Sequence, residues 1–201
     1  MVIVLDMDDT LYNEIDFVKS GFKEIASYLN ADIFDEMMLE FEKNGSGKIF
    51  NRYAKDEQEL KKLIEIYRFH TPDISLENEK LLDDIKQNFQ TALITDGHYI
   101  MQQNKYNRLN LKKWIDYAVF TDKYHTQKPN KRAYEMVENY FEDEKKFCYI
   151  ADNPKKDFIA PNELGWLTIR YKNPVGVYRD ERSDADFQIE NLSDVLEIIN
   201  E

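Results

Sequence analysis

The chain has 201 residues, which is enough for one domain or for one domain with a large insertion, and a core of that size needs no disulfide or metal. Hydrophobic residues make up 42% and aromatic residues 13%, which excludes a disordered chain. The formal charge of −12 opposes binding to nucleic acid. With a single cysteine, Cys148, and no signal-like or membrane-spanning run, we expect a soluble cytoplasmic protein that binds no membrane.

Short apolar runs, rich in β-branched and aromatic residues, predict five buried strands. None of them alternates polar with apolar residues, which is typical of the strands of a parallel sheet. Apolar residues at helical spacing follow two of the later runs, at 133–140 and 192–199. The alternation of strands and helices predicts an α/β fold, with a Rossmann-like parallel sheet flanked by helices. The five predicted strands are residues 2–5, 91–94, 117–120, 147–150 and 167–171.

One connection breaks this alternation, because the 80 residues from 11 to 90 contain no convincing strand. Four helical stripes of apolar residues replace it, with breaks at 44–47 and 71–73. We predict a helical cap domain of residues 11–90, inserted after the first strand of a core domain formed by residues 1–10 and 91–201. In the alternative, two of these helices cover a face of the sheet. The stripes span residues 15–29, 34–41, 60–67 and 81–89.

Most of the predicted strands end in carboxylate or hydroxyl side chains, and ligands of an open parallel sheet bind at these carboxyl ends. A single Asp after a strand also serves as a helix cap, but caps alone do not explain a whole cluster with a lysine. Carboxylates packed this closely repel one another unless a cation lies among them, and oxygen ligands favour Mg²⁺. The residues concerned are Asp6, Asp8, Asp9, Thr95, Asp96, Lys128, Asp152 and Asp157.

Four segments in order resemble the motifs of the haloacid dehalogenase superfamily. Residues 5–11 (LDMDDTL) resemble its first motif, and residues 93–97 (LITDG) are similar to its second, an apolar strand that ends in Thr or Ser. The pair Lys128-Pro129 matches the third, and residues 151–157 (ADNPKKD) resemble the fourth, with Ala151 where Gly is usual. The separations between the motifs also fit, and the 80-residue insertion lies where the family places a helical cap.

The resemblance implies a magnesium-dependent phosphatase and a role for each motif residue. Asp6 would be the nucleophile that forms an aspartyl-phosphate, and Asp8 the general acid and base. Carboxylates of Asp6 and Asp152, with the backbone carbonyl of Asp8, would hold Mg²⁺. Asp157 would orient a metal-bound water or Lys128. Phosphate would be bound at Thr95, at the following backbone N–H groups from Asp96 on, and at Lys128. For Asp9 we expect only a loop or cap hydrogen bond.

Substrate choice is expected to lie in the predicted cap, where Arg52 and Arg68 are the candidate contacts. Residues 67–72, with Gln102 and Lys105, resemble a branch of phosphatases that act on small metabolites such as sugar or triose phosphates. The expected partner is therefore a small phosphomonoester. A phosphomutase of the same family is the alternative enzyme. A phospho-receiver signalling module fits poorly, because its phosphorylated Asp ends an internal strand, and a non-catalytic member would lack Asp6 or Asp8.

Overall fold

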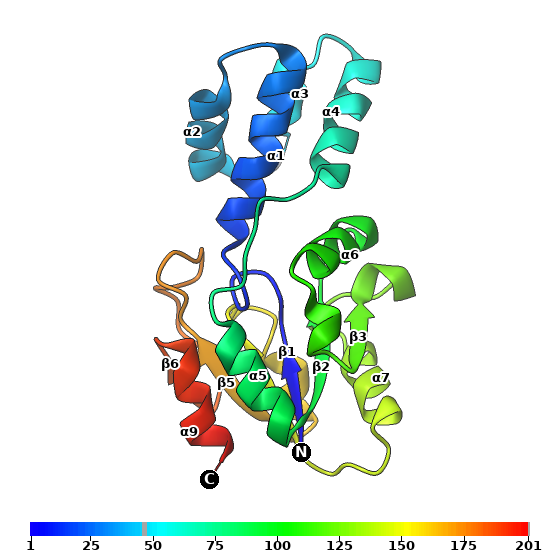
Figure 1. The fold of residues 1–201 in the computed structure, drawn as a ribbon, viewed down its shortest axis with the longest axis vertical. Coiled ribbons are helices and arrows are strands. Elements are labelled where there is room, and N and C mark those ends of the chain that lie inside the picture. The colour runs from blue at the N-terminus through cyan, green and yellow to red at the C-terminus, as the bar shows by residue number, and fades with distance from the viewer. Residues whose placement is uncertain (46–47, 201) are drawn as a thin grey trace. The chain divides into compact units, whose positions relative to one another are not determined.

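The computed structural model describes residues 1–45 and 48–200, and the chain forms two compact units (Figure 1). The first, the core unit, comprises Met1–Glu14 and Ser75–Glu201; the second, the helical unit, is Ile15–Ile74. These bounds differ from the predicted ones because the fourth helical stripe belongs to the core unit. Of the predicted break at 44–47, Ser46 and Gly47 lie outside the described residues.

The core unit contains a parallel sheet of six strands, in the order β3-β2-β1-β4-β5-β6. Each of the five predicted strands forms, and β6 is an addition. Leu5 of β1 lies opposite Leu93 of β2 on one side and Ile150 of β4 on the other, so the carboxyl ends of these three strands lie at the same edge of the sheet, within two residues of one another. The strands are β1 (Val2–Leu5), β2 (Gln90–Thr95), β3 (Tyr117–Phe120), β4 (Phe147–Ala151), β5 (Leu167–Tyr171) and β6 (Phe187–Ile189).

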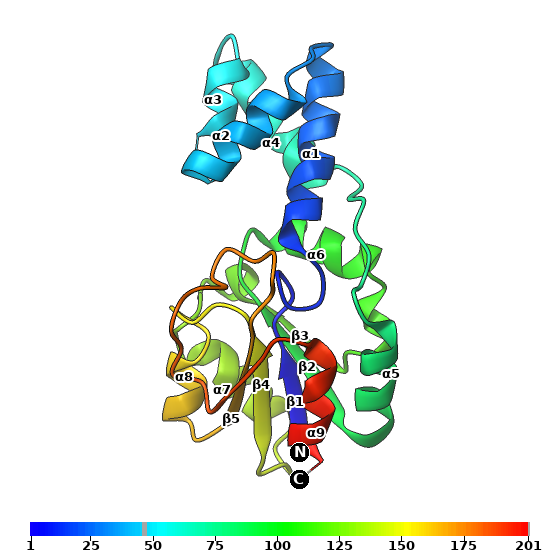
Figure 2. The ribbon, with the colours of Figure 1, turned by 90° about the vertical axis from the view of Figure 1, so that its left-hand side faces the viewer.

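Helices cover both faces of the sheet (Figure 2). On one face α7 (Arg132–Tyr140) and α8 (Ile159–Glu163) pack over Val2, Val4 and their neighbours, with Tyr134 and Trp166 in edge-to-face contact. On the opposite face lie α5 (Glu79–Asn88) and α9 (Val195–Ile199). The remaining elements are α6 (Tyr99–Arg108) and three short 3₁₀ helices, Leu111–Lys113, Thr121–Tyr124 and Leu192–Asp194. The predicted Rossmann-like α/β sheet is confirmed.

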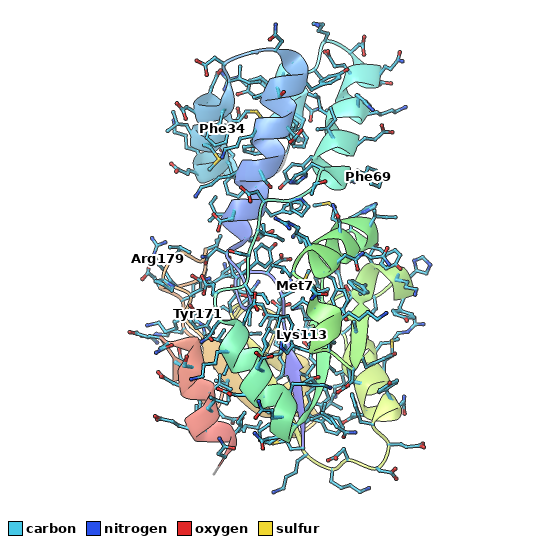
Figure 3. All side chains as sticks on the ribbon, viewed as in Figure 1. Met7, Phe34, Phe69, Lys113, Tyr171 and Arg179 are labelled. Atoms are coloured by element: carbon cyan, nitrogen blue, oxygen red, sulfur yellow. The ribbon has the colours of Figure 1, made fainter. Side chains whose placement is uncertain are left out.

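The helical unit has an apolar core of its own. Its helices are α1 (Glu14–Leu29), α2 (Phe34–Asn44), α3 (Ile49–Tyr53) and α4 (Glu57–Phe69). Their stripes bury Val18, Phe22, Ile25, Met37, Ile49 and Leu63 against one another. Phe34, labelled in Figure 3, packs against the edge of this cluster. None of the helices in the described part of the chain is both long and apolar enough to cross a membrane.

Stability of the core unit can be tested with a matched pair of isoleucines. Ile94 in β2 is fully buried, whereas Ile159 in α8 is 46% exposed. Ile94→Ala leaves a cavity in the sheet core and should lower the free energy of unfolding by about 2–5 kcal/mol. Ile159→Ala should change it by about 0.5 kcal/mol or less. Both tryptophans, Trp114 and Trp166, lie in the core unit, so their fluorescence in a urea titration reports on it. Equal losses for the two variants would contradict the assigned core.

Candidate active site

The strand order places the candidate site between β1 and β4. The chain runs outward from β1 to β2 and β3 on one side and from β4 to β5 and β6 on the other. A parallel sheet whose order reverses in this way leaves a crevice at the carboxyl ends of the two central strands. Asp6 directly follows β1, Thr95 ends β2 and Asp152 directly follows β4. The fold therefore brings together residues that are far apart in the sequence.

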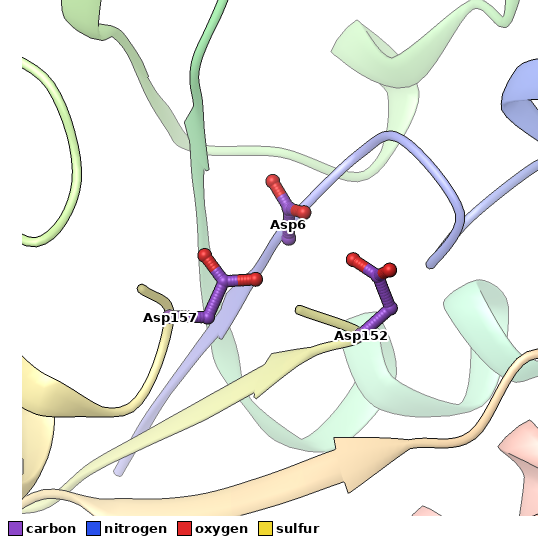
Figure 4. A group of neighbouring side chains, drawn as sticks. All are labelled: Asp6, Asp152 and Asp157. Atoms are coloured by element: carbon purple, nitrogen blue, oxygen red, sulfur yellow. The ribbon is translucent and has the colours of Figure 1, made fainter. Parts of the chain in front are cut away.

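Three carboxylates converge at this edge of the sheet (Figure 4). Asp6, Asp152 and Asp157 are all buried, and each offers an oxygen within 4.8 Å of one from each of the others. Asp157 comes from the turn after β4, where its backbone N–H donates to the carbonyl of Asn153. Like charges at such separations repel strongly, so the cluster needs positive charge.

Lys128 supplies part of that charge. Its Nζ lies 2.8 Å from Oδ1 of Asp6 and 2.7 Å from Oδ1 of Asp157, and it donates to the hydroxyl of Tyr149 at 3.1 Å. The ammonium group is almost completely buried. Burial by itself would lower the pKa of Lys128, but Asp157 and Asp6 raise it well above its ordinary value. Lys128 is therefore a fixed cation in the site.

The charge balance is incomplete without a further cation. Burial, followed by the charge of Asp157, raises the pKa of Asp6 to about 7 despite the opposing effect of Lys128. Burial and the charges of Asp6 and Asp157 raise the pKa of Asp152 to about 9. Within the described residues the Asp152 carboxylate has no hydrogen bond or ion pair, and Oδ2 of Asp6 has none either. If all three carboxyl groups are ionised, the single ammonium group leaves a surplus of negative charge, and a divalent cation suits that surplus.

The three carboxylates are not equally available to a metal. Oδ1 of Asp157 contacts Lys128, and its Oδ2 accepts a hydrogen bond of 3.1 Å from the backbone N–H of Asn153. Both oxygens of Asp157 are thus occupied, whereas Asp6 and Asp152 have oxygens to offer. Asp6 and Asp152 therefore fit direct coordination of a cation, and Asp157 fits the positioning of Lys128.

Asp8 lies two residues beyond Asp6 in a different environment. Its Oδ1 is 2.8 Å from Nζ of Lys105 and also accepts from the Tyr12 hydroxyl, and its Oδ2 accepts from Nε2 of Gln102 at 2.7 Å. Burial alone would raise the pKa of Asp8, but Lys105 and these hydrogen bonds together lower it. The two aspartates of the first motif thus have pKa shifts in opposite directions.

Thr95 and Asp96, both at the carboxyl end of β2, differ in what they offer a phosphate. Oγ1 of Thr95 accepts a hydrogen bond of 2.6 Å from Gln102. The Asp96 carboxylate accepts from the Thr121 hydroxyl, the Lys128 backbone N–H and Nζ of Lys156, at 2.8–3.1 Å. Burial would raise the pKa of Asp96, but Lys128 and Lys156 lower it. Its side chain is therefore an internal anchor, and only its backbone N–H is available to an anion.

A cavity of about 270 Å³ in the core unit is lined by Asp6, Asp8, Asp96, Lys128 and Asp152, whereas Thr95 and Asp157 are not among its lining residues. Its rim includes Glu14 and the loop residues Val177 and Tyr178. Arg170, which is fully buried in β5, fixes this loop by donating to the backbone carbonyls of Asp152, Tyr178 and Glu181. Arg170 thus links the backbone of Asp152, a candidate metal ligand, to the loop that lines the cavity.

The remaining residues comprise Asp9, two arginines of the helical unit, and several residues to which the sequence assigned no role. Asp9, at a positive φ of 53°, accepts from the backbone N–H of Glu14 at the start of α1, so the predicted loop or cap hydrogen bond is confirmed. Arg52 and Arg68 belong to the helical unit, where Arg52 pairs with glutamates of α2; their role with substrate stays a prediction. Sequence reasoning assigned no role to Tyr12, Glu14, Lys156, Arg170 or the loop with Val177 and Tyr178. Gln102 and Lys105, which the sequence analysis did name, are three residues apart, a spacing that places both on one face of a helix.

Comparison with known proteins agrees with this geometry. A model of haloacid dehalogenase-like hydrolases matches residues 3–170. The chain belongs to this family. It is 27% identical to a glyceraldehyde 3-phosphate phosphatase of Methanocaldococcus jannaschii, over 98% of this chain and 96% of the relative.

Solved structures show the same fold. A HAD-superfamily hydrolase of Geobacter sulfurreducens has a TM-score of 0.74 at 13% identity and covers 98% of this chain and 95% of its own. YfnB of Bacillus subtilis, whose crystal structure has bound magnesium, has a TM-score of 0.73 at 14% identity and covers 100% of this chain and 98% of its own.

Because burial and the neighbouring carboxylates disfavour an ionised Asp152, we predict that replacing it with a neutral amide stabilises the metal-free protein. The pKa in the fold, about 9, lies above the ordinary 3.8, so stability falls as the pH rises through that interval. In EDTA at pH 7.5, Asp152→Asn should raise the melting temperature by about 2–4 °C, the shift that roughly 1 kcal/mol produces at this size. The gain should shrink toward about pH 4. Asp157→Asn is the matched control and should lower the melting temperature, because Lys128 and Asn153 lose a partner. A lower melting temperature for Asp152→Asn would contradict this charge balance.

Proposed function

We propose that the protein is a Mg²⁺-dependent phosphatase that hydrolyses small phosphorylated metabolites through an aspartyl-phosphate on Asp6. One observation carries the proposal: unpartnered carboxylate oxygens of Asp6 and Asp152 face the same crevice beside the buried ammonium group of Lys128. A nucleophile, a cation site and a fixed positive charge are thus combined at one edge of the sheet. These are the parts that phosphoryl transfer requires.

The class of enzyme rests on the family. The chain is a haloacid dehalogenase-like hydrolase, and a relative that aligns with 98% of this chain is a phosphatase, so this protein is a phosphoric monoester hydrolase. Asp8 supports the same class from the residues alone, because an acid two residues after the nucleophile can serve proton transfer to an oxygen leaving group.

The donor set fits Mg²⁺. Asp6 and Asp152 would hold the ion through carboxylate oxygens, and Asp8 through its backbone carbonyl; all of these are the hard oxygen ligands that Mg²⁺ prefers. When bound, the ion would offset the charge of the phosphoryl group and of the surrounding carboxylates. Asp157 would remain outside the coordination, because both of its oxygens are occupied.

The first chemical step is phosphoryl transfer to the enzyme. Lys128 and the Thr95 hydroxyl, with the backbone N–H groups that follow it, would bind the phosphoryl oxygens and place phosphorus in line with one carboxylate oxygen of Asp6, so that the other would hold the ion. As the first oxygen attacks, the bond from phosphorus to the ester oxygen breaks, and the electron pair remains on the ester oxygen. Asp8 would donate the proton that makes it a hydroxyl group. A phosphoryl dianion beside Asp8 favours its protonated form, since like charges raise a carboxyl pKa.

The second step returns Asp6 to its starting state. Water attacks the phosphorus, the bond from phosphorus to Asp6 breaks, and inorganic phosphate is released. Asp8, now ionised, would accept the proton of the water, and Lys105 favours this ionised form. One carboxylate thus serves as acid and then as base within one turnover.

The proposed substrate class follows from the relative and from the cavity. The M. jannaschii relative is a glyceraldehyde 3-phosphate phosphatase, and a cavity of about 270 Å³ suits a small metabolite. We therefore propose sugar or triose phosphate-like monoesters. The helical unit would act as the cap that selects among them, with Arg52 and Arg68 as candidate contacts. A phosphomutase is the second candidate; it would convert a sugar phosphate into its isomer and release little inorganic phosphate.

The nucleophile can be tested by trapping the intermediate. Asp6→Asn should abolish turnover and any covalent phosphoryl-enzyme seen by intact-mass spectrometry. Asp8→Asn should turn over slowly yet still accumulate the phosphoryl-enzyme with p-nitrophenyl phosphate, whose leaving group needs no proton. Its rate should fall by about 10²–10⁴-fold, the usual contribution of general acid–base catalysis. Near-normal turnover by Asp6→Asn would overturn the mechanism.

Metal dependence is tested separately. Activity should vanish in EDTA and return with excess Mg²⁺, measured as phosphate release from a panel of small phosphomonoesters. Mg²⁺ should also raise the melting temperature of the wild type, because a ligand that binds only the folded state stabilises it. Asp152→Asn should lose most of that shift. Full activity in EDTA would exclude the proposed role of the ion.

A further inference from the structure

Helix α6 contains buried polar residues in an unusual position. Gln102 and Lys105 are only 1% and 2% exposed, although most lysines keep their ammonium group in water. Three residues apart, they lie on one face of the helix. Both reach the same carboxylate, that of Asp8. The buried face of α6 is therefore directed at one residue of the first motif.

The contacts hold both oxygens of Asp8. Lys105 lies 2.8 Å from Oδ1, to which Tyr12 also donates, and Gln102 donates to Oδ2 at 2.7 Å. A carboxylate held at both oxygens is unable to turn about its last torsion without breaking a charge-assisted hydrogen bond. The orientation of Asp8 is thus set by α6 and Tyr12.

Gln102 extends this arrangement to the phosphate side of the site. Its Nε2 also lies 2.6 Å from Oγ1 of Thr95, so one amide group bridges Thr95 and Asp8. The position of Asp8 is thereby coupled to the position of the proposed phosphate-binding hydroxyl. The bridge fixes the distance between the two groups.

The energetic cost supports a role beyond packing. Burying an ammonium group and an amide removes them from water, and an apolar pair of similar volume would often stabilise a fold at least as well. A polar face on α6 is instead what precise orientation of a charged group requires. Proton transfer is sensitive to misplacements of about 1 Å, which can cost about 10²-fold in rate.

We propose that Lys105 and Gln102 are positioning residues that hold Asp8 where it exchanges a proton with the leaving oxygen and with water. Neither touches the reacting atoms; both act through Asp8. The proposal rests on the function proposed above, with Asp8 as acid and base. Removal of either residue should therefore impair proton transfer to the leaving group more than it impairs attack by Asp6.

The dependence on leaving group measures this effect. The ratio kcat/KM reports on the steps up to departure of the alcohol. In Lys105→Met it should fall by roughly 10- to 100-fold for an alkyl phosphate such as glycerol 3-phosphate, the cost of a misplaced catalytic group. For p-nitrophenyl phosphate, whose leaving group needs no proton, it should change by less than about threefold. In Lys105→Met, hydrolysis of the phosphoryl-enzyme should also be slow, because Asp8 is misplaced for accepting the proton of water. This variant should therefore release a burst of p-nitrophenol close to one equivalent of enzyme.

Further variants separate positioning from folding. Gln102→Met retains Lys105 and should give the same leaving-group signature, so it tests the proposal if Lys105→Met fails to fold. Lys105→Arg keeps the cation and should recover part of the kcat/KM for glycerol 3-phosphate that Lys105→Met loses. Gln103→Met is the matched control on α6, because Nε2 of Gln103 donates to the Tyr99 hydroxyl and not to Asp8. This variant should leave kcat/KM unchanged for both substrates.

The outcomes are distinct from those of the proposed function. Equal losses for both substrates in Lys105→Met and Gln102→Met, with no burst, would show a general structural role and overturn the proposal. A wild type that forms no phosphoryl-enzyme on Asp6 would instead overturn the function itself.

Discussion

The ion pairs of Lys128 with Asp6 and Asp157 are the interaction on which the rest of the site depends. Lys128 comes from the loop after β3, Asp6 from the end of β1 and Asp157 from the turn after β4. One buried ammonium group therefore ties together three segments at the carboxyl edge of the sheet. Because burial of this charge is costly, any rearrangement that separated it from either carboxylate would be strongly unfavourable. The geometry at Asp6 is fixed by this requirement.

The same interaction determines which groups remain available for chemistry. Lys128 occupies one oxygen of Asp6 and one of Asp157, and the backbone of Asn153 occupies the other oxygen of Asp157. What remains is one oxygen of Asp6 and the whole carboxylate of Asp152. The protein thus satisfies the groups that need only be held in place and leaves unsatisfied those that would meet a cation or a phosphoryl group. Without a metal, these unsatisfied carboxyl groups destabilise the fold, and that cost accompanies their availability to a ligand.

Much of this arrangement could be predicted from the sequence, because apolar runs and strand-end motifs are local patterns. The five longer strands and the convergence of Asp6, Thr95, Lys128 and Asp152 follow from such patterns. The three-residue strand β6 is too short and too exposed for a signal, since Phe187 and Gln188 are exposed. Helix α6 shows no apolar stripe because Gln102 and Lys105 occupy its buried face. The fourth helical stripe does form a helix, but a stripe does not specify the unit against which it packs.

Arg170 has a consequence for the way in which this site can change. Its guanidinium group holds the loop through the backbone carbonyls of Tyr178 and Glu181, and every amino acid supplies such a carbonyl. The path of the loop is therefore largely independent of the side chains that it displays. Val175 and Val177 are exposed, so replacing them disturbs no packed core. Random mutation in this segment can alter the chemical character of the cavity rim while the sheet and its carboxylates stay in place.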